Sequence, residues 1–176
     1  MLRKLSLILL GISLFISATL LHAQVKTDYD HTANFATYKT YSWLKVQSGN
    51  SLWDDRIKQD VDAQLAAKGW TKVDSNGDAA VSAFRSTQNQ QTLDTFYNGF
   101  GGGWGWRGFG GMGMGMSTTT TENTKVGNVV IDIFDSHTKK LLWRGTDSQD
   151  LSSNANSNIK KLTKDIDNMF KHFPPK

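Results

Sequence analysis

The chain has 176 residues, of which 20% are charged, with a formal net charge of +4 and no cysteine. The absence of cysteine excludes disulfides, thiolate nucleophiles and cysteine-ligated zinc, so stability must come from a packed core. Lysine and arginine are interspersed with aspartate and glutamate and form no block, which argues against nucleic acid as a partner.

Residues 1–23 have the pattern of a cleavable signal peptide. Arg3 and Lys4 precede an apolar stretch over residues 5–21, and the small residue Ala23 follows it. We expect cleavage after Ala23, which lowers the net charge from +4 to +2 by removing Arg3 and Lys4. Retention as a short membrane anchor is the alternative, but the stretch is only at the lower end of bilayer-spanning length. No cysteine follows it, so we expect no covalent lipid anchor and a periplasmic or secreted protein.

The mature chain, residues 24–176, is predicted to be a single domain that begins with strands and a helix. Apolar and polar residues alternate over residues 25–30, and aromatic and β-branched residues fill residues 37–44, so both are predicted strands. Apolar residues then recur at every fourth position, which predicts an amphipathic helix capped by Ser51 and ended by Gly69. Two further strands are predicted, over residues 70–73 and 79–85.

The second half of the chain contains a predicted hairpin and a second helix. Val129, Ile131 and Ile133 give the run NVVIDIF an apolar face, and the run KLLWRGT is its predicted partner. The last segment has apolar residues three and four positions apart and is ended by Pro174, which predicts a helix. Two helices with five or six strands predict an α+β fold, with both helices on one face of a mainly antiparallel sheet.

Residues 98–116, NGFGGGWGWRGFGGMGMGM, are too rich in glycine to favour a regular element, and we predict a mobile loop. Its aromatic and basic side chains are a candidate surface for stacking on sugars, a partner protein or the membrane interface. The alternative is that these rings fold back over the open face of the sheet. The candidate binding residues are Phe100, Trp104, Trp106, Arg107 and Phe109.

The same loop contains a candidate soft-metal site. Met112, Met114 and Met116 occupy alternate positions, and thioether sulfur is a soft ligand that suits Cu(I). The alternative is that these methionines arose as low-complexity sequence or serve as adaptable apolar contacts.

Catalytic signals are weak along the chain. Asp28, Asp30 and His31 stand together at the end of the first predicted strand, where they could bind a divalent ion or share a proton. The alternative places both aspartates on the solvent face of an edge strand, with Asp30 beginning a turn. The sequence has no G-x-S-x-G nucleophile turn, Walker loop or zinc motif. We therefore predict no catalytic residue and no cofactor.

Several segments resemble the domain-of-unknown-function family 4136. They are VKTDYD, NFATYKTYSWL, the helix end AAKGW, the strand AAVSAF, the glycine- and tryptophan-rich insert, and GNVVIDIFD followed by LLWRGT. The resemblance covers nearly the whole mature chain and implies an exported protein of the bacterial envelope, a class with no established activity. Many members are lipoproteins, and this chain departs from them by lacking the lipobox cysteine.

We therefore expect an exported, non-enzymatic domain whose glycine-rich loop contacts an envelope protein, a glycan or the membrane interface. Soft-metal binding through the three methionines is the alternative function, and a hydrolytic enzyme is the third.

Overall fold

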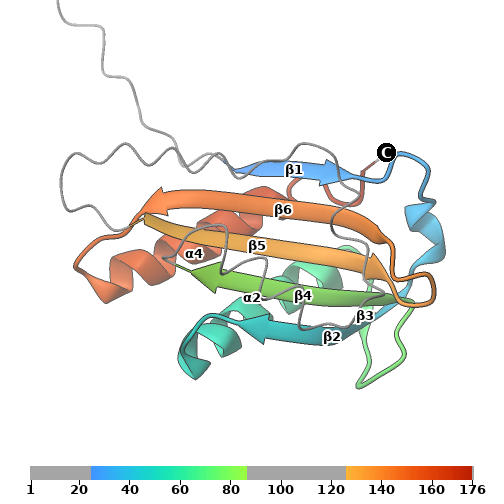
Figure 1. The fold of residues 1–176 in the computed structure, drawn as a ribbon, viewed down its shortest axis with the longest axis horizontal. Coiled ribbons are helices and arrows are strands. Elements are labelled where there is room, and N and C mark those ends of the chain that lie inside the picture. The colour runs from blue at the N-terminus through green and yellow to red at the C-terminus, as the bar shows by residue number, and fades with distance from the viewer. Residues whose placement is uncertain (1–24, 87–125, 176) are drawn as a thin grey trace, which may run out of the picture.

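The computed structural model describes residues 25–86 and 126–175, which form one six-stranded sheet with two helices behind it (Figure 1). The strands lie in the order β1-β6-β5-β4-β2-β3. Their bounds are β1 Lys26–Tyr29, β2 Thr40–Gln47, β3 Thr71–Lys72, β4 Ala79–Ser86, β5 Val126–Asp135 and β6 Leu141–Asp150. The helices are α2, Ser51–Ala67, and α4, Ala155–Phe170, with a short 3₁₀ turn, η1, at Phe35–Thr37.

The sheet is mixed. Strands β1, β6, β5 and β4 pair antiparallel, whereas β2 runs parallel to both β4 and β3. The parallel part arises because α2 carries the chain from the end of β2 back to its beginning, as parallel neighbours require. The predicted α+β class and mainly antiparallel sheet are confirmed, and the parallel edge adds a detail that the strand patterns did not indicate.

Both helices pack on the same face of the sheet, as predicted. Ile57, Val61 and Leu65 of α2 are completely buried against that face, and α4 contributes its own buried apolar stripe. The strands meet them with alternate residues such as Val129, Ile131 and Ile133. Trp143 belongs to the same core as Tyr41, so the predicted shared face of these aromatic residues is confirmed. Within the described ranges, neither helix is long and apolar enough to cross a membrane.

Both helices begin directly after an asparagine that caps the N-terminus. The side chain of Asn50 accepts a hydrogen bond from the amide of Leu52 at 2.9 Å, so Asn50 and not Ser51 caps α2. Gly69 follows the end of α2 with φ of +82°, the left-handed conformation that glycine adopts at little cost. Asn154 caps α4 in the same way, by accepting from the amide of Ser157 at 3.2 Å.

Helix α4 approaches β6 closely at Gly145. A β-carbon built there would lie 2.6 Å from the Trp143 ring and 3.1 Å from Met169 of α4, so only glycine fits. Beyond α4, the ring of Phe173 lies edge-on to Phe35, Trp70 and Trp143. This aromatic cluster fixes the C-terminal segment to the core, and with it the position of α4.

Candidate functional site

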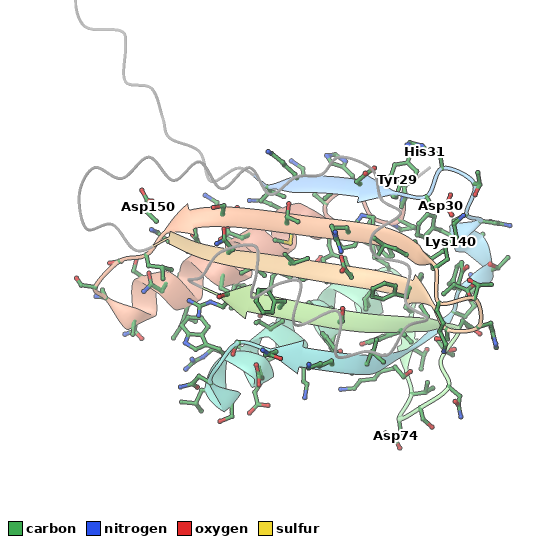
Figure 2. All side chains as sticks on the ribbon, viewed as in Figure 1. Tyr29, Asp30, His31, Asp74, Lys140 and Asp150 are labelled. Carbon is green, nitrogen blue, oxygen red and sulfur yellow. The ribbon has the colours of Figure 1, made fainter. Side chains whose placement is uncertain are left out.

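The predicted aspartate and histidine group lies where β1 ends and β6 begins (Figure 2). One oxygen of Asp30 accepts hydrogen bonds from the hydroxyl and amide of Thr32, and the other lies 2.6 Å from the Lys140 ammonium. The Lys140 hydrogen bond is the largest cause that lowers the pKa of Asp30 to about 2, and Thr32 adds to it. His31 packs on the ring of Tyr29, with 4.2 Å between ring centroids.

This geometry does not make a metal site. Both carboxylate oxygens of Asp30 are occupied, and Asp28 accepts a hydrogen bond from the neighbouring amide of Tyr29. Across the two described ranges, no group of three histidine, cysteine or acidic side chains is placed to hold a metal ion. The described geometry therefore gives no support to the metal interpretation of Asp28, Asp30 and His31, and Asp30 begins a turn, as the alternative predicts.

The loop residues chosen from the sequence lie outside the described residues. This applies to the signal segment 1–23, to the predicted binding residues and to the predicted copper ligands. Each stays a prediction. The residues concerned are Phe100, Trp104, Trp106, Arg107, Phe109, Met112, Met114 and Met116.

The most unusual polar group that the structure describes is a pair of buried carboxyls, which we call the carboxyl pair. Asp147 on β6 and Asp165 on α4 are only 2% and 3% exposed. Neither oxygen of Asp147, nor Oδ2 of Asp165, has a hydrogen-bond donor among the described residues. The two carboxyls interact with each other, and a hydrogen bond between two carboxyls requires a proton on one of them.

Burial and mutual repulsion hold the carboxyl pair partly protonated. Burial is the main cause that raises the pKa of Asp165 to about 7, and the charge of Asp147 adds to it. Burial also raises the pKa of Asp147. Lys161 and Lys164 of α4 act in the opposite direction on Asp165, but more weakly. Near neutral pH Asp165 is therefore partly protonated, as the repulsion between two like charges held together favours.

The sequence contains a signal for the carboxyl pair that pattern reasoning missed. Asp165 sits three residues after Leu162 and four before Met169, inside the apolar stripe of α4. An acidic residue at such a core-facing position is uncommon and usually has a specific partner. Asp147 lies on the same sheet face as Val129, its neighbour on β5, but no sequence rule indicates that α4 would bring Asp165 to it.

A second polar arrangement lies at the surface, at the end of the sheet where β2 and β4 end. Trp53, in the first turn of α2, packs partly against the core. The guanidinium carbon of Arg85, near the end of β4, lies 4.2 Å from the centroid of the Trp53 ring, and that of Arg56 lies 5.1 Å from it. These distances are within the range of cation–π attraction.

An exposed leucine adjoins this cluster. Leu52 is 61% exposed and is the one large apolar side chain that the described part of the chain exposes to this degree. It lies four residues before Arg56 in α2, and side chains at that spacing are neighbours on a helix surface. We call Leu52, Trp53, Arg56 and Arg85 the arginine–tryptophan surface.

Solved structures with a similar fold come from proteins of very different sequence. A PDZ domain protein from Parabacteroides distasonis is 14% identical, with a TM-score of 0.59 over 88% of this chain. This chain spans only 36% of that protein. Two PelC dodecamer structures from Paraburkholderia phytofirmans are 12% and 9% identical and have TM-scores of 0.47 and 0.48. Each comparison covers 85% of this chain and 97% of PelC.

The sequence itself matches one family model. No curated protein matches the chain. The model of a domain of unknown function, DUF4136, matches residues 25–175, which include all the strands and both helices described above. The chain therefore belongs to the DUF4136 family.

Proposed function

We propose that this chain is exported and acts in the cell envelope by binding another envelope component, not by catalysing a reaction. The observation that carries this proposal is the arginine–tryptophan surface. Tryptophan and arginine are the residue types most enriched at the energetic centres of protein interfaces. Leu52 adds an exposed apolar side chain beside them.

Export is supported by the predicted signal peptide over residues 1–23 and by the family resemblance. The test is to express the full-length chain with a C-terminal tag in a Gram-negative host and to measure the mass of the protein in each cell fraction. We expect a periplasmic or secreted protein that begins after Ala23 and has no acyl group. A cytoplasmic protein that retains residues 1–23 would contradict export.

Binding is tested on the same tagged protein in intact cells. Chemical crosslinking followed by denaturing purification is expected to yield a discrete adduct with an envelope component. The control is the same treatment of cells that export an unrelated tagged domain of similar size. If no adduct exceeds the background of that control, the binding function is refuted.

The alternating methionines support a second candidate function, Cu(I) binding. Replacing Met112, Met114 and Met116 with leucine keeps their apolar character and removes the sulfur ligands. We expect the purified mature protein to bind Cu(I) and the triple variant to lose that affinity. Equal affinity of the two proteins would exclude the methionines as ligands.

A further inference from the structure

We propose that the arginine–tryptophan surface binds an acidic peptide segment of a partner protein. This inference rests on the proposed binding function and specifies the chemistry of the partner. The surface combines two guanidinium groups, an indole ring that positions them, and one exposed apolar side chain.

Both arginines lack an acidic partner within the described ranges. The ion pairs in those ranges join Lys72 to Asp62, Lys140 to Asp30 and Arg144 to Asp132. Arg85 is half-buried, and this burial lowers its pKa, which means that the charged form has lost solvation without gaining a carboxylate. A carboxylate from another molecule would supply the missing interaction.

The nearby acidic residues do not supply it. Asp54 accepts a hydrogen bond from the amide of Ser48 at 2.8 Å and thereby holds the turn before α2. Asp55 is exposed and forms no ion pair with Arg56 or Arg85. Among the described residues, therefore, no carboxylate pairs with either guanidinium.

The geometry favours a peptide over a glycan. Sugars bind tryptophan by stacking on the ring, but two guanidinium groups already lie over the Trp53 ring. The planar guanidinium of arginine carries N–H donors in a fork that fits a carboxylate, and it keeps this capacity when its carbon lies over a ring. Leu52, next to Arg56 on the helix, adds an apolar contact that an apolar residue beside the carboxylate would cover.

The decisive experiment is site-specific photocrosslinking in cells. The photoreactive amino acid p-benzoylphenylalanine replaces Leu52 in the full-length chain, alone and together with Arg56→Gln and Arg85→Gln. We expect a protease-sensitive adduct whose crosslinked segment, mapped by mass spectrometry, is rich in aspartate and glutamate. The two glutamine substitutions are expected to reduce the adduct at least about tenfold, as the loss of charge-assisted hydrogen bonds predicts. Lys160→Gln, which removes an exposed charge on α4, is the matched control and should leave the adduct unchanged.

A defined probe tests the same chemistry with purified protein. A fluorescent peptide of alternating glutamate and leucine is titrated against the mature protein, and a peptide with glutamine in place of glutamate is the control. We expect only the acidic peptide to bind, with an affinity that falls as salt is added and falls about tenfold or more in the double arginine variant.

The outcomes separate this inference from the proposed function. A protein adduct obtained by general crosslinking but not from position 52 would overturn the acidic-peptide surface and leave the binding function in place. A protease-resistant adduct would identify a glycan or lipid and would also overturn the inference. So would an adduct that persists at full yield in the double arginine variant. Absence of any adduct by either method would refute both.

Discussion

Strand β6 contributes one residue to each of two buried polar pairs, and the two pairs accommodate a buried carboxyl in different ways. On the face of the sheet opposite the helices, Arg144 holds Asp132 through two hydrogen bonds of 2.7 Å each. On the helix face, Asp147 meets a second carboxyl, Asp165, and three of the four oxygens have no donor in the part of the chain that the structure describes. One carboxyl is kept charged by an arginine, and the other is kept partly neutral by a proton.

The difference shows that the neighbours of a buried carboxyl depend on the face of the sheet on which it lies. Arg144 gives the Asp132 carboxylate two charge-assisted hydrogen bonds. A shared proton is retained only while the pH stays below the raised pKa, so the contact between α4 and β6 depends on pH. The two pairs therefore predict different responses to the same kinds of substitution.

The largest effect is expected from breaking the ion pair. Arg144→Met leaves the carboxylate of Asp132, which is fully buried, without its bidentate partner. We expect a loss of about 3–5 kcal/mol in the free energy of unfolding, measured by urea denaturation at pH 7. The double variant Asp132→Val with Arg144→Met should lose much less than the single variant, because it leaves no buried charge. If the double variant is as unstable as the single one, packing and not charge explains the loss.

The next largest loss of stability is expected from a substitution that disturbs the packing of α4 on β6 and leaves both carboxyls in the sequence. In Gly145→Ala the new methyl group would lie 2.6 Å from the Trp143 ring and 3.1 Å from Met169, so the Trp143 ring must shift and the packing of α4 on β6 is disturbed. We expect a loss of about 1–3 kcal/mol, typical of overpacking, and a pKa of Asp165 closer to its ordinary value, measured by NMR titration. Gly127→Ala is the control, because its methyl group would meet only the movable side chain of Leu151. An unchanged Asp165 titration in Gly145→Ala would show that the carboxyl pair does not depend on this contact.

A substitution within the carboxyl pair is expected to stabilise the protein. In Asp165→Asn the side-chain amide can donate a hydrogen bond to Asp147 and carries no charge at any pH. Because folding raises the pKa of Asp165 from 3.8 to about 7, the folded state binds more protons between these values, and its stability falls as the pH rises through them. We expect the variant to lose this slope and to gain about 1–2 kcal/mol at pH 8, measured by denaturation from pH 4 to 8.

The control for this substitution is Asp150→Asn, which removes an exposed carboxyl from the same strand as Asp147. It should leave the stability profile unchanged. A variant Asp165→Asn that is destabilised at pH 8 and keeps the slope of the native protein would refute the shared proton.

The fold was largely predictable from the sequence, whereas the polar sites were not. The strands and helices follow from local periodicity: the apolar residues of α2 recur at every fourth position, and Val129, Ile131 and Ile133 alternate along β5. Parallel pairing of β2 with β4 depends on the path of α2 across the sheet, which no local pattern records.

The polar sites depend on contacts between distant elements. Asp147 and Asp165 are brought together by the packing of α4 on β6, and Arg85 reaches Trp53 only because β4 ends beside the start of α2. Asp28, Asp30 and His31, which the sequence offered as a possible metal-binding or proton-sharing group, are close in sequence but have local roles in the structure. Proximity in sequence was a poor guide to chemistry here, whereas an aspartate within an apolar helix stripe was a usable signal.

The smallest effect is expected from the ion pair of Asp30 with Lys140, whose lysine side chain is 61% exposed although that of Asp30 is only 11% exposed. Folding lowers the pKa of Asp30 to about 2, so its contribution to stability is complete above its ordinary pKa of 3.8 and is lost as the pH falls through about 2. Because the Lys140 side chain is 61% exposed, water and salt screen the attraction, and Lys140→Met should cost only about 0.5 kcal/mol at pH 7. NMR titration should show the pKa of Asp30 rising but remaining below 3.8, because Thr32 still donates to it. A loss as large as that from Arg144→Met would mean that the difference in exposure between Lys140 and Arg144 does not explain how much each ion pair contributes to stability.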